Sequence, residues 1–278
     1  MSPSSSPASG SDVVLYSTPA PGVALLTLNR PDRMNAWNAD LSARYFELLE
    51  HCAQSDDVRA IVVTGAGRGF CAGADMDALQ SIGSSSDGGS GGAPSAEAAS
   101  GSHLQSFTTT VPKPVIAAVN GACAGIGMVQ ALACDIRFAA AGAKFTTAFG
   151  RRGLIAEYGM SWLLPRLVGT ANALDLLLSA RVVLAEEAHA MGMVNAVLPV
   201  DKLVDHAVAY ASDLAANVSP TSMAVMKQQV YADYGMTLGD AEQKALRLMK
   251  ESLRRPDFKE GVASFLEKRP PNFSPVTR

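Results

Sequence analysis

Short apolar runs in the first two-thirds of the chain predict strands, because each run stops at a turn-forming segment. The first two runs flank Thr18–Gly22, which holds two prolines and a glycine, and so they predict a hairpin. The later runs are apolar at almost every position, as expected of strands buried on both faces of a parallel sheet. The predicted strands are Val13–Tyr16, Val23–Leu28, Ala60–Thr64, Val115–Val119 and Ile136–Ala139.

Helical periodicity separates these strands and dominates the end of the chain. Leu41, Tyr45, Leu48 and Cys52 share one helical face, and a helix of small residues is expected from about Gly125 to Ala133. Strand, helix, strand at this spacing predicts an α/β fold with a largely parallel arrangement. From Asp201 onward the periodicity is helical throughout, which places a candidate boundary near Pro199. We therefore expect a core over 12–199 and a helical region over 200–278.

Two further segments show no apolar period. Residues 1–11 are rich in Ser and Pro and predict a disordered tail. Residues 83–102 contain six Gly and seven Ser, which predicts a flexible loop. That loop is interpreted either as a tolerated surface insertion or as a lid beside a site, and the sequence does not choose between them.

Composition narrows the classes of protein. Charged residues make up 18% of the chain, below the roughly 25% of an ordinary soluble chain, which suggests surface buried against other subunits. A net charge of −3 gives no footprint for nucleic acid. No apolar run is long enough for a membrane span, and the N-terminus has no signal peptide, so we expect a cytoplasmic protein. The four His and four Cys are scattered, which argues against a metal site, a disulfide framework or a site built on histidine.

Two glycine-rich turns follow two of the predicted buried strands, at residues 65–75 and 120–127. Glycine permits close backbone approaches, and free N–H groups at such turns attract negative charge. Two turns at the ends of neighbouring strands can aim two N–H groups at one oxygen, as in an oxyanion hole. Two alternatives are tight connections without a function and a dinucleotide-binding loop. The second is weak, because only the loose pattern Gly67–Ala72 fits GxGxxA.

Several motifs resemble the crotonase family, the enoyl-CoA hydratases and isomerases. They cover roughly residues 12–273 in order: Asn29-Arg30-Pro31 with Asn35-Ala36, Phe70-Cys71-Ala72-Gly73-Ala74-Asp75, Lys113–Gly121, Ala133-Cys134-Asp135 and Phe265–Pro270. The resemblance implies a crotonase (ClpP/crotonase-like) spiral of ββα units, with a C-terminal helical region that contributes to trimerisation. It further implies an acyl-CoA substrate, no separately bound cofactor, and a homotrimer or a dimer of trimers.

By the same resemblance, the oxyanion hole falls on the main-chain N–H groups of Ala74 and Ile126. The hydratases of the family use two glutamates, and counting along the motifs places Val129 and Phe149 at those positions. Neither side chain can transfer a proton. This sequence therefore departs from the hydratase pattern.

Glu157 matches the position where the isomerases of the family carry a single carboxylate, and its neighbours are largely apolar. The resemblance thus implies isomerisation of an enoyl-CoA with Glu157 as acid/base. A hydratase with a non-standard site and an acyl-CoA-binding protein without turnover are the alternatives. For Glu157 itself the alternative is an ordinary glutamate facing a helix N-terminus.

The resemblance also implies that CoA contacts Arg33, Ala72, Ala74 and Lys268, the last from the same or a neighbouring subunit. For Arg33 and Lys268 a solvated surface cation is an equally good interpretation. Asp75 and Asp135 are expected to position the turns rather than to take part in the chemistry.

Overall fold

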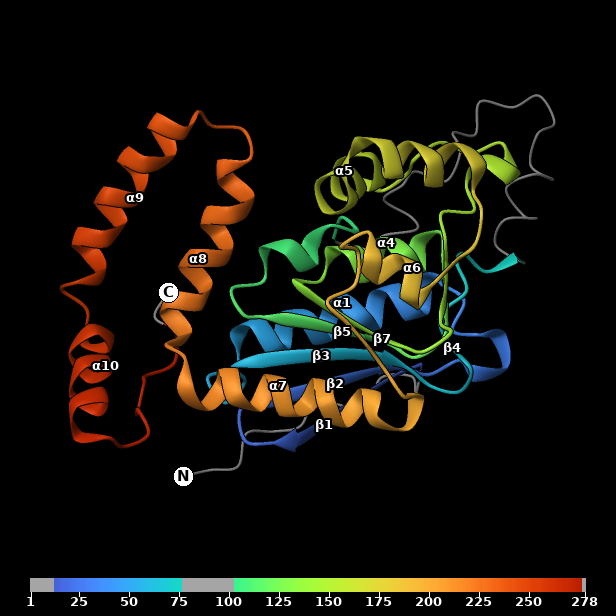
Figure 1. Cartoon of the computed structure of the whole chain (residues 1–278). Helices are drawn as coiled ribbons and strands as arrows, with labels where there is room; N and C mark the ends of the chain where they lie inside the picture. Colours follow the sequence, from blue (N-terminus) through green and yellow to red (C-terminus); the bar gives the residue numbers. More distant parts are fainter. Residues whose placement is uncertain (1–12, 77–102, 277–278) are drawn as a thin grey trace, which may run out of the picture.

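The apolar runs of the sequence form the central sheet of the protein (Figure 1). The computed structural model describes residues 13–76 and 103–276, so the expected tail 1–11 and the expected loop 83–102 lie outside the described residues. The sheet has six strands in the order β1-β2-β3-β5-β7-β10. Their bounds are Val14–Ala20 (β1), Val23–Leu28 (β2), Ala60–Gly65 (β3), Val115–Val119 (β5), Ile136–Ala140 (β7) and Ala196–Leu198 (β10).

The hairpin β1–β2 is present, but its first strand is longer than predicted. β1 continues through Pro19 to Ala20, which pairs with Val23 after an irregularity in the register. The segment predicted as turn is therefore mostly strand. Proline is tolerated there because β1 is an edge strand, so its missing N–H costs no ladder bond. From β2 to β10 the neighbouring strands are all parallel, as the alternation of strands and helices predicts.

A second sheet has the order β4-β6-β8-β9 and consists of very short strands. They are Gly69–Cys71 (β4), Ala122–Ala124 (β6), Lys144–Thr146 (β8) and Val183–Leu184 (β9). Each of the first three follows a strand of the central sheet, in the pairs β3–β4, β5–β6 and β7–β8. α4 (Ile126–Ala133) comes directly after β6. The expected repeat of two strands and a helix is thus visible in the chain order.

Helices cover the central sheet so completely that β3 and β5 are buried at every position. α1 (Ala39–Gln54) packs against β1 and β2 and begins at Asn38, whose side chain accepts the Leu41 N–H at 3.0 Å. α7 (Leu203–Asn217) packs across β2, β3, β5 and β7 (Figure 1). Packing on the sheet therefore continues beyond Pro199. α5 (Met160–Ser179) and α6 (Ala185–Ala190) complete the core, and α5 packs against α4.

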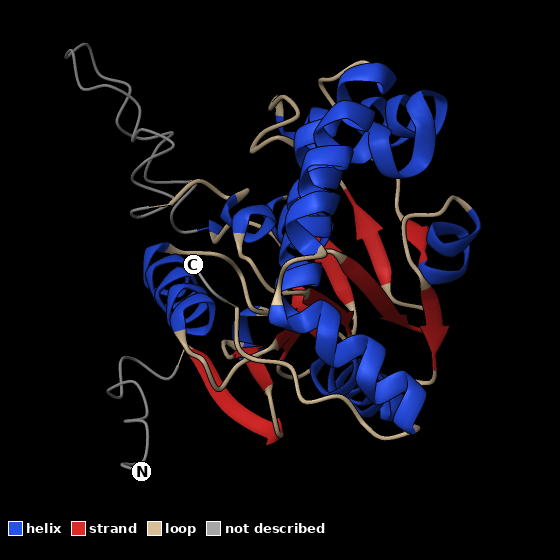
Figure 2. Cartoon of the chain, turned by 90° about the vertical axis from the view of Figure 1, so that its left-hand side faces the viewer, coloured by secondary structure: helices blue, strands red, loops and turns tan. Residues whose placement is uncertain are grey.

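Three helices extend away from this core and form a C-terminal arm, at the left of Figure 1. They are α8 (Pro220–Asp233), α9 (Leu238–Ser252) and α10 (Pro256–Glu267), and the described chain has no strand after β10. In Figure 2, where the left side of Figure 1 faces the viewer, the arm stands in front of the strands. None of the described helices is long and apolar enough to cross a membrane.

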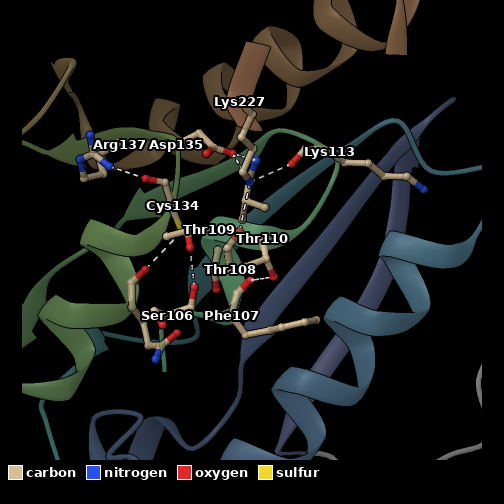
Figure 3. A network of polar contacts seen from close by, with 12 residues as sticks. Ser106, Phe107, Thr108, Thr109, Thr110, Lys113, Cys134, Asp135, Arg137 and Lys227 are labelled. Atoms are coloured by element: carbon tan, nitrogen blue, oxygen red, sulfur yellow. Dashed lines mark hydrogen bonds and ion pairs between the residues drawn. The ribbon is translucent and has the colours of Figure 1, made fainter. Parts of the chain in front are cut away.

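A largely buried ion pair ties the arm to the core. Lys227 on α8 approaches the Asp135 carboxylate at 2.7 Å and also donates to the carbonyls of Thr108 and Lys113 (Figure 3). Asp135 accepts a second hydrogen bond from the Val115 N–H at 2.8 Å, at the start of β5. Asp135 therefore joins the strand, the end of α4 and the arm, in keeping with the structural role expected of it.

Lys227→Met is expected to lower the free energy of unfolding by about 3–5 kcal/mol, because it leaves a buried carboxylate without its partner. Adding Asp135→Asn to this variant should recover much of that loss, since the buried charge is then removed as well. Urea denaturation measures both. Arg181→Met, which breaks the more exposed pairs of Arg181 with Asp175 and Glu187, is the control and should cost far less. If Lys227→Met and Arg181→Met lowered the free energy of unfolding equally, the Lys227–Asp135 pair would not be a stabilising one.

Candidate active site

The two glycine-rich turns lie side by side because the strands that lead into them pair with each other. β4 and β6 are parallel, with Cys71 opposite Cys123. Ala74 lies three residues beyond the first of these cysteines, and Ile126 lies three beyond the second. Both short strands fall inside segments that the sequence predicts as turns, so the turns are partly strand. The pairing brings the two N–H candidates to equivalent places on neighbouring chains.

The backbones of the two turns approach each other closely at glycine. Gly73 and Gly125 have φ angles of +108° and +50°, which L side chains rarely adopt. A Cβ placed on Gly73 would lie 3.3 Å from the Ala124 carbonyl oxygen, and one placed on Gly125 would lie 3.9 Å from the Gly73 Cα. Conformation therefore favours glycine at both positions, and the close contact with Ala124 adds a spatial reason at Gly73.

The amides of Ala74 and Ile126 are left without main-chain acceptors within the described residues. Trp37 donates to the Gly73 carbonyl at 2.7 Å and accepts the Asp75 N–H at 2.9 Å, so the Ala74 amide between them points the other way. Ile126 is the first residue of α4, whose N-terminal amides have no partner inside the helix. Two free donors at adjoining turns have the character of an oxyanion hole, strengthened by the dipole of α4.

Asparagine side chains hold the first turn in shape. Asn35 donates to the carbonyls of Ala66 and Gly69 at 2.9 and 2.8 Å. Asn120 accepts the Gly65 N–H at 3.2 Å and donates to the carbonyl of Gly67 at 3.0 Å. Both residues lie in the motifs quoted for the family resemblance, but their role in bracketing this turn comes from contacts between residues far apart in the sequence. No local pattern could have revealed it.

An ion pair fixes the residue next to the Ala74 amide. Arg30 lies 2.8 Å from the Asp75 carboxylate, and it also donates to the Ala36 carbonyl. Asp75 is buried and its own N–H is bonded to Trp37. This arrangement agrees with the positioning role expected of Asp75. It adds Arg30 to the residues that orient the site; in the sequence Arg30 is part of a motif but has no assigned role.

The two positions at which the family resemblance places the hydratase glutamates are apolar and buried. Val129 lies on α4, where its N–H donates to the Gly125 carbonyl at 3.0 Å. Phe149 follows β8, and its Cε1 lies 3.9 Å from where a Cβ on Gly125 would be. The ring therefore borders the turn that carries Ile126. Neither residue can exchange a proton with a substrate or bind a catalytic water strongly.

Glu157 lies in the connection between a single 3-10 turn, Gly150–Arg152, and α5. This connection is linked to Phe149, because the Leu154 N–H donates to the Phe149 carbonyl at 3.1 Å. Ala156 and Tyr158 pack against the core on either side of Glu157. Within the described residues the Glu157 side chain has no hydrogen-bond partner, and partial burial raises the pKa of its carboxyl. A raised pKa suits a group that both takes and returns a proton.

Glu157→Gln is expected to make the protein more stable than the wild type at neutral pH. The folded-state pKa of Glu157 is raised, so folding disfavours its charged form, and stability falls as pH rises through this pKa. At a pH below the unfolded-state pKa both side chains are neutral and the difference should vanish. Thermal unfolding at a series of pH values measures this. A wild type that gains stability relative to the variant on going to neutral pH would contradict it.

The residues expected to contact CoA divide into two groups. Arg33 is exposed on a short 3-10 helix, Pro31–Arg33, and the next residue, Met34, accepts the Ala72 N–H at 3.0 Å. Arg33, Ala72 and Ala74 therefore belong to one region. Lys268 is exposed at the end of α10 on the arm, at the opposite side of the molecule from β4 (Figure 1). Within one chain, the structure does not bring Lys268 to the other three.

A family of proteins described as enoyl-CoA hydratase/isomerase has a sequence model that matches residues 19–275 of this chain. The chain belongs to the enoyl-CoA hydratase/isomerase family. The 1,2-epoxyphenylacetyl-CoA isomerase of Escherichia coli (strain K12) is 40% identical over 266 residues, which cover 91% of this chain and 95% of the isomerase. Both the expected family and its expected range along the sequence are confirmed.

Solved structures of the family confirm the crotonase fold. An enoyl-CoA hydratase from Polaromonas sp. JS666 aligns with a TM-score of 0.85 at 31% identity, covering 94% of this chain and 99% of the other. An enoyl-CoA hydratase from Mycobacterium marinum is 48% identical, with a TM-score of 0.68, and covers 81% of this chain and 100% of its own. Relatives of this family member thus carry both isomerase and hydratase names.

The described residues contain neither a cluster of metal ligands nor an exposed thiol. In residues 13–76 and 103–276 no three His, Cys, Asp or Glu side chains gather as a metal site would require. The four cysteines are free and buried, and burial raises the pKa of Cys52, Cys71 and Cys134 to about 12. Buried thiols of this kind are unreactive, so they serve packing.

Proposed function

We propose that this family member isomerises the double bond of an enoyl-CoA thioester. The thioester carbonyl oxygen accepts hydrogen bonds from the N–H groups of Ala74 and Ile126, which stabilise the charge that grows on it as the enolate forms. Glu157 takes a proton from C2 or C4 and returns it at the other carbon. The substrate keeps its composition, so no water and no further cofactor enter the reaction.

The observation that supports this function best is that free amides and apolar side chains occur together around Gly125. Two unbonded amides adjoin there, and both positions that would carry the glutamates of a hydratase are apolar. Hydration needs a water held by a group that can take its proton, which Val129 and Phe149 do not provide. Isomerisation needs only one carboxylate, and Glu157, with its raised pKa, is available for it. Similarity to a protein named as an isomerase is in keeping with this choice.

CoA itself would bind along the region of the first turn. Arg33 offers a positive charge to the phosphates, and Ala72, whose N–H is used by Met34, meets CoA through its carbonyl oxygen. Lys268 would reach CoA only from a neighbouring subunit. Coenzyme A enters as part of the substrate.

The proposed assembly is a homotrimer or a dimer of trimers, and the surface of the arm supports it. Its helices expose large apolar side chains, among them Leu238 at 86%, Phe265 at 82% and Leu266 at 72%, more than a monomer normally leaves in water. Lys268 ends α10 on the same arm, so a neighbouring copy packed there would also lie close to Lys268. Size-exclusion chromatography with light scattering tests this, and a stable monomer at micromolar concentration would refute it.

Incubation with trans-2-enoyl-CoA and trans-3-enoyl-CoA in D₂O tests the reaction. Isomerisation predicts interconversion of the two substrates, with deuterium at C2 or C4 of the products. A hydratase with a non-standard site, which the names of the solved relatives favour, would instead form 3-hydroxyacyl-CoA. Formation of that product as the main one would overturn the proposal. Binding without any exchange would identify an acyl-CoA-binding protein.

A further inference from the structure

The ring of Phe149 stands beside the candidate oxyanion hole. It is 6% exposed, and its Cε1 lies 3.9 Å from where a Cβ on Gly125 would be, at the turn that presents the Ile126 N–H. We propose that Phe149 is a specificity-determining residue that keeps water away from the carbonyl oxygen held by Ala74 and Ile126. This inference rests on the proposed function, because it assumes that a thioester oxygen occupies that place.

The backbone at Phe149 is held in place by hydrogen bonds that do not involve the Phe149 side chain. Thr146 and Thr147 donate their hydroxyls to the carbonyls of Ala180 and Leu176, at 3.0 and 2.9 Å, which pins the end of β8 to the end of α5. Ala148 then adopts a φ of +61°, and the Phe149 N–H turns back to the Thr147 carbonyl at 2.8 Å. This kink directs the ring toward the start of α4.

The carbonyl of Phe149 has a separate task. It accepts the N–H groups of Arg152 and Leu154, at 2.9 and 3.1 Å, and so closes the connection that leads to Glu157. Any side chain at position 149 can keep these two bonds. Substitution of the ring therefore changes the wall of the site while the path of the chain toward the carboxylate is preserved.

Exclusion of water has two chemical consequences. First, N–H donors act more strongly on a developing oxyanion in a dry, low-dielectric site than in a wet one. Second, the exclusion of water decides whether the isomerised enoyl-CoA or 3-hydroxyacyl-CoA forms. Hydration would place the water oxygen on C3 and a proton on C2, whereas isomerisation only moves a proton between C4 and C2. A ring that leaves no space for water beside C3 and the carbonyl oxygen favours the second outcome.

Phe149→Leu tests this with a matched control. Phe138→Leu makes the same change at an equally buried ring, which packs against His206 and Tyr210 on the side of α7. The ratio of isomerised to 3-hydroxyacyl product from trans-2-enoyl-CoA is measured by liquid chromatography and mass spectrometry. We expect at least a roughly tenfold lower ratio in Phe149→Leu, and an unchanged ratio in Phe138→Leu.

A spectroscopic measurement separates this inference from the proposed function. The carbonyl stretch of a bound ¹³C-labelled enoyl-CoA, read by Raman difference spectroscopy, should move toward its value in water in Phe149→Leu only. If the wild type binds the thioester without isomerising it, the proposed function fails, and this shift still decides the role of Phe149. An unchanged product ratio together with an unchanged stretch would overturn the inference, as would a wild type that binds no enoyl-CoA.

Discussion

Glu157→Gln is expected to lower the rate of double-bond isomerisation by about 10²–10⁴-fold, the range typical of losing a general acid–base group. The amide keeps the size of the side chain but cannot take a proton from the acyl chain. Binding should change little, because the residues proposed to hold CoA lie around the first turn and on the arm, and not in the connection before α5. Deuterium exchange at C2 and C4 measures the first effect, and calorimetric titration with an unreactive CoA thioester measures the second.

Two comparisons sharpen this expectation. Glu157→Asp keeps a carboxylate on a shorter side chain and should retain more activity than the glutamine variant. Glu47→Gln removes a charge from the exposed face of α1 and should leave the rate unchanged. Wild-type exchange in Glu157→Gln would show that another group moves the proton.

Gly73→Ala is expected to lower kcat by about 10²–10³-fold, as removal of one oxyanion donor does in other enzymes. The φ of +108° is unfavourable for alanine, and the new Cβ would lie 3.3 Å from the Ala124 carbonyl oxygen. Relief of that strain must rotate the peptide that carries the Ala74 N–H or push the two turns apart. Either movement takes a donor away from the carbonyl oxygen.

Gly142→Ala is the matched control for this variant. Gly142 also has a left-handed φ, of +74°, but a Cβ there would meet nothing within 4 Å. Both variants should lose stability to backbone strain, and only Gly73→Ala should lose kcat beyond that. Steady-state kinetics beside thermal unfolding separates the two effects. A similar loss of kcat in both variants would show that strain alone, and not the donor geometry, limits the reaction.

The longer elements could be predicted because their signals are local. A short run of apolar residues such as Ala60–Gly65 predicts a buried strand in an α/β chain. The spacing of Leu41, Tyr45 and Cys52 predicts a helix with one apolar face. The short strands β4, β6 and β8 could not be predicted. Three residues carry no period, and their strand character comes from pairing with segments tens of residues away.

For the candidate site, the identities of the residues could be predicted, but their arrangement in space could not. Its candidate residues could be named from motifs, since Ala74, Ile126 and Glu157 lie in segments that resemble those of the family. Their mutual placement depends on contacts that only folding creates: the pairing of Cys71 with Cys123, and the ring of Phe149 against Gly125. The separation of Lys268 from the other CoA candidates also emerged only from the course of the arm.

The sequence by itself determined the family, the alternation of strands and helices, and the apolar residues at the two positions where the family resemblance places hydratase glutamates. These are properties of residue type and of spacing along the chain, so they can be recognised without a structure. The tertiary structure decided which amides remain unbonded, which glycines lie at the approach of the two turns, and which ring borders Gly125. Such properties depend on distances between residues far apart in the chain, and these distances are set by how the two sheets pack and not by any local preference.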